Sequence, residues 1–326
     1  MLVFILRRIA AGALVMLAVS FVSFTLFQYV GDPVTSMLGQ DATEQQRRQL
    51  RADLGLDQPA AVQFARFVGR AVQGEFGLSL SQGRRVSSLI IERLPATLEL
   101  AAGAAAVSLL LGIPLGVYAA LRRGRPGSQA MMLLSLVGVS MPTFLLGILL
   151  ILVFSVVLKV LPSFGRGEVV HFGAWSSGLF TLDGWKHIVL PAFTLAAFQV
   201  ALLIRLVRAE MLEVLRTDYI KFARARGLSD RVVHFGHALR NTLVPVITIA
   251  GLQLGGLIAF AIITESVFQW PGLGLLFIQA IGMADVPVMA AYLCLVALIF
   301  VTINLGVDLL YVAVDPRLRI TPSSGH

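Results

Sequence analysis

Residues 242–264 read TLVPVITIAGLQLGGLIAFAIIT, and no aspartate, glutamate, lysine or arginine interrupts them. A continuous apolar run of this length matches the ~20 helical residues that cross about 30 Å of hydrocarbon. Runs of similar character occupy 9–30, 100–121, 130–158, 188–204 and 286–307. Closed β-barrels need shorter segments of alternating polarity, so these runs predict helices. The sequence therefore predicts an all-α integral membrane protein with six transmembrane helices.

The composition of the whole chain agrees with a membrane environment. Its 326 residues are 57% hydrophobic and 13% charged, with a mean hydropathy of +0.85. A typical soluble domain has about 25% charged residues. The first apolar run follows Arg7 and Arg8, as in a secretory signal, but it is long for a signal and no small-residue cleavage site follows it. An uncleaved first helix is therefore expected.

Positive charge in the short connections predicts the orientation of the helices. Two arginines precede the first helix, three lie at 122–125, and eight lysines and arginines lie at 205–241. On the opposite side, 265–285 has none, and the three at 159–187 are offset by two acids. Both termini are therefore expected in the cytoplasm. The formal net charge of +8 reflects this bias, which makes a nucleic-acid partner unnecessary to explain it.

The predicted spans divide the chain into four parts. A cytoplasmic N-terminus with the first helix is expected over 1–30, an extracytoplasmic segment with short helices over 31–95, a five-helix core over 96–313, and a cytoplasmic tail over 314–326. In the outer segment, Thr43 and Gln46 have capping-box spacing, which predicts the start of a helix. A second helix is predicted over 61–72, whose apolar stripe suits the membrane surface, the end of another helix or a partner protein.

The chain contains no motif of a nucleotide-binding, metal-binding or hydrolytic site. The patterns GxxxxGK[ST], HExxH, CxxC and GxSxG are all absent, and the five histidines are scattered. The six apolar runs also lack the acids and histidines that intramembrane chemistry ordinarily uses. We therefore expect a non-enzymatic protein with no catalytic residue, cofactor or metal of its own.

The basic segment 205–241 predicts two helices separated by a break. Apolar positions after Arg205 continue the fourth transmembrane helix, and Asp218 can begin a short helix. That helix is expected to end at Gly227, because glycine suits the left-handed position after a helix. Ser229 or Asp230 can then cap the next helix. The short helix would be exposed between two hinges, with small side chains that let the backbone of a partner come close. Tyr219 and Phe222 would supply aromatic anchors.

Two motifs in and after this helix carry a resemblance: ARARGL at 223–228 and HALRNTLVP at 237–245. They are similar to the coupling loop of permease subunits in binding-protein-dependent ABC importers, most of all the dipeptide/oligopeptide/nickel branch (peptide permease B-type). Further similar pieces follow in order along most of the chain: LGLDQP at 54–59, RLPATLEL at 93–100, PTFLLG at 142–147, ESVF at 265–268, PGLG at 271–274 and DPR at 315–317. The loop departs from the sugar-importer version in its greater length and in Lys221, where that version has glutamate.

The resemblance implies a type I ABC importer permease that forms the pore for peptides or similar small solutes in the bacterial cytoplasmic (inner) membrane. It also implies four kinds of partner: a second permease subunit forming a heterodimer, two ATPase subunits that bind ATP and magnesium, an extracytoplasmic substrate-binding protein, and membrane lipid. Closure of the ATPases would move the transmembrane helices as rigid bodies through the short coupling helix. The residues assigned to ATPase coupling are Asp218, Tyr219, Ala223, Arg224, Ala225, Arg226, Gly227 and Leu228.

The substrate path is less clearly marked, and its candidates are Met141, Pro142, Gly255 and Glu265. Met141-Pro142 and the glycines of the fifth helix permit kinks or close helix approach, which serve a pore or simple packing equally well. Glu265 suits either the amino terminus of a substrate or a solvated helix end with a salt-bridge partner.

Other functions of a six-helix protein remain open at this point. A stand-alone secondary transporter or channel ordinarily carries inverted repeats or acids at mid-membrane, and we find neither here. An export or lipid-handling permease is a third possibility. A solvated basic loop attracted to anionic lipid headgroups would explain the charges at 205–241 but not the spacing of its small residues.

Overall fold

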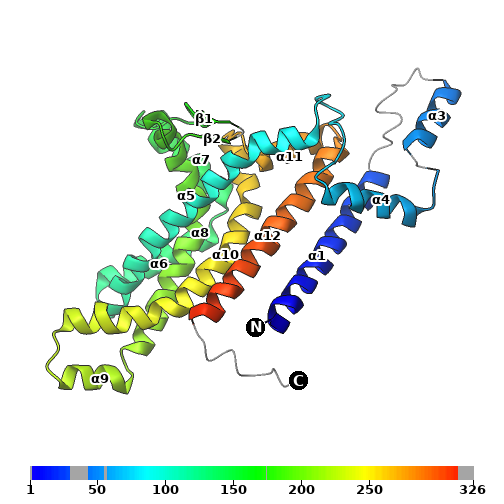
Figure 1. Ribbon diagram of the computed structural model, residues 1–326. Helices are drawn as coiled ribbons and strands as arrows, with labels where there is room; N and C mark the ends of the chain where they lie inside the picture. The colour runs from blue at the N-terminus through cyan, green and yellow to red at the C-terminus, as the bar shows by residue number, and fades with distance from the viewer. Residues whose placement is uncertain (1, 30–42, 55–56, 174, 315–326) are drawn as a thin grey trace. The chain divides into compact units, whose positions relative to one another are not determined.

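The computed structural model describes residues 2–29, 43–54, 57–173 and 175–314, so residues 30–42 and most of the predicted tail lie outside the described residues. Within the described part, the chain is built from helices and one small sheet of two strands (Figure 1). The elements are α1 (Leu2–Tyr29), α3 (Glu44–Leu54), α4 (Ala60–Val72), α5 (Val86–Leu121), α6 (Pro126–Ser140), α7 (Thr143–Leu150), the π-helical η1 (Ile151–Val157), β1 (Val170–Phe172), β2 (Trp175–Ser177), α8 (Leu182–Val214), α9 (Asp218–Ala225), the π-helical η2 (Val232–Ala238), α10 (Leu239–Val267), α11 (Leu273–Gly282) and α12 (Val286–Val314).

Five helical stretches are long and apolar enough to cross a membrane. They are Ile5–Leu26, Val86–Leu121, Leu182–Val214, Val232–Val267 and Val286–Leu309. These confirm five of the six predicted spans as continuous helices. The predicted run 188–204 is the core of a much longer helix, because apolar positions continue through the basic residues that follow it.

The third predicted span is not one continuous helix. The run 130–158 divides into Pro126–Ser140 and Thr143–Val157, which are bent by 110° from each other. Met141, between them, has an extended backbone with φ −80° and ψ 132°. A proline disfavours helical geometry in the residue before it, and Pro142 cannot donate a backbone hydrogen bond. The chain thus has up to six spans if this bent pair counts as one.

The contacts divide the chain into two compact units, each described separately. Unit 1 comprises Met1–Thr97, His171–Ser177 and Pro271–Thr302. Unit 2 comprises Leu98–Val170, Gly178–Trp270 and Ile303–His326.

In unit 1, the outer segment is held by aromatic packing and by a capping box. Phe64 of α4 packs edge-on against Phe21 and Phe24 of α1, with ring centroids 5.8 and 5.6 Å apart. The apolar stripe predicted over 61–72 therefore packs against the first transmembrane helix. Before α3, the backbone N–H of Thr43 donates to Oε1 of Gln46 at 3.0 Å, and Thr43 Oγ1 accepts from the N–H of Gln46 at 3.3 Å. These two bonds confirm the predicted capping box.

A buried carboxylate fixes the loop before α5 to the start of α12. Asp285 is fully buried, and its Oδ2 accepts hydrogen bonds from the hydroxyl of Ser79 at 2.5 Å and from the N–H and hydroxyl of Ser81 at 3.0 and 2.6 Å. Burial by itself raises the pKa of Asp285, but these hydrogen bonds favour the charged form and leave its pKa below the ordinary value. Asp285 is therefore ionised, and its carboxylate holds the loop through these hydrogen bonds.

In unit 2, two glycines of α5 let α8 approach closely. A Cβ at Gly112 would lie 2.6 Å from Cβ of Leu203, and one at Gly116 would lie 2.6 Å from Cβ of Val207. The pattern Gly112-x-x-x-Gly116 is a known sequence signal for tight helix contact in membranes, and sequence analysis overlooked it. The helix α11 and the β1–β2 sheet were also not predicted, because they lie in segments expected to be connections.

Candidate functional site

The short helix α9 begins at Asp218, as the sequence predicts, and ends at Ala225, two residues before the predicted Gly227. It follows a turn after α8 and precedes the helix that continues through η2 into α10 (Figure 1). The turn contains the hydroxyl of Thr217, which donates to the backbone oxygen of Val214 at 2.6 Å. The next helix starts at Asp230, with Ser229 accepting the first helical bond from the N–H of Val233 at 3.0 Å. The expected helix–break–helix order of 205–241 is thus confirmed.

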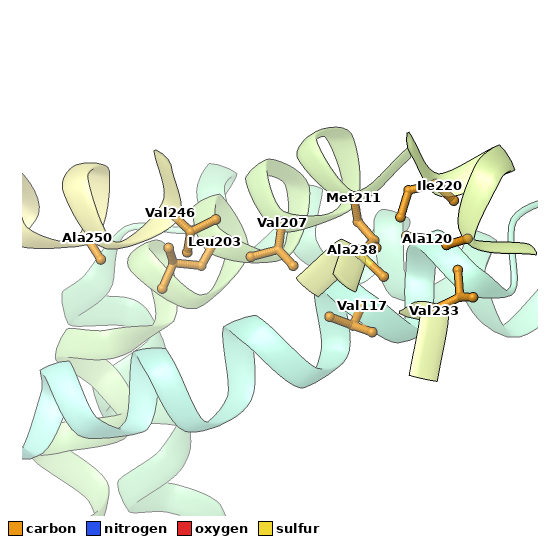
Figure 2. Packing of buried hydrophobic residues seen from close by; sticks show 11 residues of the cluster. Val117, Ala120, Leu203, Val207, Met211, Ile220, Val233, Ala238, Val246 and Ala250 are labelled. Carbon is orange, nitrogen blue, oxygen red and sulfur yellow. The ribbon is translucent and has the colours of Figure 1, made fainter. Parts of the chain in front are cut away.

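One face of α9 is buried in the chain's own core. Ile220 is 0% exposed and Ala223 is 7% exposed. Figure 2 shows the cluster to which they belong. It joins α5, α8, α9, η2 and α10, and its residues are Val117, Ala120, Leu203, Val207, Met211, Ile220, Ala223, Val233, Ala238, Val246 and Ala250. A displacement of α9 therefore acts directly on three membrane-length helices, because close-packed side chains transmit strain.

The other face of α9 is exposed and carries aromatic and charged side chains. Tyr219 is 41% exposed and Phe222 is 64% exposed. The hydroxyl of Tyr219 accepts a hydrogen bond from the side chain of Asn241 at 2.6 Å, which ties the helix to the start of α10. The Arg226 guanidinium lies over the Phe222 ring, 5.8 Å from its centroid. Such amphipathic aromatic and arginine side chains are the kind that anchor protein interfaces.

The end of α9 is a Schellman motif built on Gly227. Gly227 has φ +79°, and its N–H donates to the backbone oxygen of Arg224 at 2.9 Å. The N–H of Leu228 donates to the backbone oxygen of Ala223 at 3.4 Å. This pair of bonds is the pattern that closes a helix through a left-handed residue. A Cβ placed on Gly227 would meet nothing within 4 Å, so glycine is required here by its backbone conformation.

The structure brings most of the predicted coupling residues together on one short helix and its cap. Those with exposed side chains are Asp218, Tyr219, Arg224, Ala225, Arg226 and Leu228. Ala223 differs from the expectation, because its side chain faces the core of the chain and not a partner. Phe222 was predicted as an aromatic anchor but left out of the assigned set, and it is more exposed than Tyr219, three positions away on the same helix. The i, i+3 spacing of Ile220 and Ala223, typical of the buried stripe of a helix, was the signal that would have separated these roles.

The predicted substrate-path residues lie at the α6–α7 break and on α10. Met141 and Pro142 form the break between α6 and α7, and Gly255 is buried in the middle of α10. Glu265 is 0% exposed near the end of α10, so it is not the solvated helix end that was one of its expected roles. A cavity in unit 2 has a different set of lining residues, described below.

Unit 2 also contains a buried ion pair that sequence analysis missed. Oε2 of Glu99, on α5, accepts from Nε of Arg166 at 2.9 Å and from its Nη2 at 2.5 Å. Its other oxygen, Oε1, accepts from the N–H of Gly178 at 3.1 Å. Both charged side chains are at least nine-tenths buried. The pair fixes the connection between η1 and α8 onto α5.

Comparison with known proteins agrees with this architecture. The family described as "Binding-protein-dependent transport system inner membrane component" matches residues 112–320, and the family of its N-terminal region matches residues 1–101. The di/tripeptide transport system permease protein DppB of Pseudomonas aeruginosa is 39% identical over 98% of this chain and 99% of its own length. The glutathione transport system permease protein GsiC and the dipeptide transport system permease protein DppB of Escherichia coli K12 are each 38% identical over the same shares.

Among solved structures, the chain is similar to an inward-facing form of the MetNI methionine ABC transporter. The TM-score is 0.55 at 20% identity, and the match covers 70% of this chain and 96% of the other. At this identity the likeness concerns the fold.

Proposed function

Because the chain belongs to the family of binding-protein-dependent transport system inner membrane components, we propose that it imports short peptides as one permease subunit of an ATP-driven importer. As a family member it is a non-catalytic, multi-pass component of the bacterial inner membrane. The substrate class rests on similarity, since the relatives named above carry di- and tripeptides, dipeptides or glutathione. All of these solutes contain peptide bonds.

The observation that carries the coupling role is the division of α9 into a buried and an exposed face. Ile220 and Ala223 belong to the core that joins three membrane-length helices, while Tyr219 and Phe222 remain available to a partner. A partner ATPase that grips the exposed face would therefore pull on the transmembrane core through the buried one. A solvated basic loop that only attracts lipid headgroups would not need a face buried in the core.

ATP drives transport only if it stabilises one state of the permease more than the other. In the proposed complex, two ATPase subunits bind ATP and magnesium, and their closure shifts α9 together with α5, α8 and α10. A second permease subunit completes the pore, and an extracytoplasmic binding protein delivers the peptide. The residues that would contact the ATPase are Asp218, Tyr219, Phe222, Arg224, Ala225, Arg226 and Leu228, with Gly227 acting through its backbone.

Photo-crosslinking tests this assignment directly. The photoreactive amino acid benzoylphenylalanine would replace Phe222 in one variant and Phe198 in a control, since Phe198 is also exposed, at 47%, but lies within the span of α8. Crosslinking in native membranes followed by mass spectrometry is expected to attach an ATPase at position 222 and none at position 198. Attachment only of lipid at position 222 would contradict the coupling role.

Transport itself is tested with the complex purified through this chain and reconstituted in liposomes. Uptake of a labelled dipeptide is expected to require ATP and the binding protein. Uptake by this chain alone, driven by an ion gradient, would instead support a secondary transporter or channel.

A further inference from the structure

Unit 2 contains a cavity of about 450 Å³ between α5, α8, α10 and α12. Its size lies in the range of about 300–1,000 Å³ that holds small molecules in proteins. A Cβ on Gly251 would lie 2.8 Å from a methyl group of Val307, so α12 and α10 touch there. Its lining includes Gln199, Arg240, Thr248 and Val307.

Gln199 is the buried polar side chain of this cavity. It is 4% exposed, and it makes no hydrogen bond to any residue that the structure describes. The hydroxyl of Thr248, which also lines the cavity, donates to the backbone oxygen of Val244 at 3.1 Å and is thus already engaged. The Gln199 amide is therefore available to bind a group that enters the cavity.

We propose that this cavity is a subsite for the transported peptide, in which the side-chain amide of Gln199 pairs with one peptide group of the substrate. This subsite rests on the proposed function, and Gln199 is the residue that would recognise the transported peptide there. A primary amide offers two donors and an acceptor, which match the C=O and N–H of a peptide group. The surrounding apolar wall accepts the substrate's side chain, as is usual in small-molecule sites.

The chemistry of the lining favours a peptide over a lipid chain. An acyl chain would fill the apolar volume but leave the Gln199 amide unpaired. A peptide group satisfies that amide and itself avoids the penalty of an unpaired N–H in an apolar environment. Arg240, exposed at the α10 end of the same lining, supplies positive charge for the carboxylate that every unmodified peptide carries.

The test compares uptake of labelled alanyl-alanine with that of its depsipeptide, in which an ester oxygen replaces the peptide N–H. The complex purified through this chain is assayed in liposomes with one preparation of binding protein, so selectivity of that protein cancels between variants. The measured quantity is the ratio of amide to ester uptake. Gln199→Met removes the amide at nearly constant length and is expected to lower this ratio about threefold to tenfold, the value of one net hydrogen bond.

Thr194→Val is the matched control. Thr194 is also buried in α8, but its hydroxyl donates to the backbone oxygen of Leu190 at 2.9 Å and does not line the cavity. This variant is expected to keep the unsubstituted ratio. An equal ratio in Gln199→Met and the unsubstituted complex would overturn the subsite. Absence of ATP-dependent uptake of the ordinary dipeptide by the unsubstituted complex would instead overturn the proposed function.

A second measurement leaves Gln199 in place, in case Gln199→Met does not assemble. A dipeptide bearing a diazirine side chain is photolysed during turnover in the unsubstituted complex, and labelled fragments are identified by mass spectrometry. Labelling within α8 or α10 is expected, and excess unlabelled dipeptide should suppress it. Labelling confined to other parts of the complex would contradict the subsite, as would a cavity found filled by lipid or by the second permease.

Discussion

At Gly227, the effect of a substitution on backbone conformation can be separated from its effect on side-chain contacts. Its φ of +79° lies in the left-handed region, and open space surrounds the position of a Cβ. An added side chain is therefore penalised by backbone conformation and not by collision. For alanine, the left-handed conformation costs roughly 1–2 kcal/mol, which corresponds to about a 5–30-fold lower population of the capped helix end.

Asparagine tolerates this conformation better than other non-glycine residues, whereas a β-branched side chain tolerates it worst. We therefore expect peptide uptake per ATP hydrolysed to fall in the order glycine, Gly227→Asn, Gly227→Ala, Gly227→Val. Hydrogen exchange is expected to quicken in the same order at the N–H of Leu228, since that group closes the cap. Both quantities are measured on the purified complex.

The control for this series is Gly236→Ala in the same loop. Gly236 has no positive φ, and a Cβ there would meet only Val232 at 3.8 Å. This variant is expected to leave coupling unchanged. If Gly227→Asn proved more damaging than Gly227→Ala, the effect would follow side-chain volume and not conformation. That result would refute the backbone argument and indicate a partner packed against Gly227.

Three further predictions concern buried groups. Ile220→Ala empties a fully buried position and is expected to cost about 2–5 kcal/mol; the amount of ATPase that co-purifies should fall with the thermal stability of the loop. Arg166→Met leaves the buried carboxyl of Glu99 without its ion-pair partner and is expected to cost about 3–5 kcal/mol, with recovery when Glu99→Leu is added. Glu92→Gln, in an exposed ion pair, should cost no more than about 1 kcal/mol in the same thermal unfolding assay. The pKa of Asp285 is lowered in the folded chain, so its carboxylate stabilises the fold at any pH above the ordinary pKa of the group. That contribution is lost as the pH falls through the lowered pKa of the folded state. The difference in melting temperature between the unsubstituted chain and Asp285→Asn should therefore stay constant from about pH 5 to about pH 8 and shrink only below about pH 4.

The spans and the short helix α9 were predictable because their signals are local. Absence of charge over a membrane thickness is visible in any window of the sequence, and so are Asp218 and Gly227 at the two ends of a short helix. The partners of Glu99 and of Asp285 were not predictable. Arg166 is 67 residues from Glu99, and Ser79 is 206 residues from Asp285. Residue type alone does not tell which of several polar groups meets a buried carboxylate at such separations.

The division of α9 into a buried and an exposed face was only partly predictable from the sequence. Small side chains at 223 and 225 suggested a close approach by a partner, yet Ala223 packs inward and Ala225 outward. Ile220, three positions before Ala223, completes the buried stripe expected of a helix on a core. Helical periodicity alone would have assigned Ile220 and Ala223 to the core. The similarity of the motif at 223–228 to a coupling loop instead assigned all of its residues to contact with a partner.

The break at Met141-Pro142 shows why a proline alone does not predict a broken span. Pro191 and Pro245 also lie in apolar runs, and both remain inside continuous helices. At the break, the N–H of Met141 still donates to the oxygen of Val137 at 3.0 Å, and the oxygen of Pro142 accepts from the second segment at 3.0 and 3.2 Å. Each segment thus ends with its backbone groups engaged, which a membrane interior demands of any interruption. A proline marks where a helix can part, and the bonding available on both sides determines whether it does.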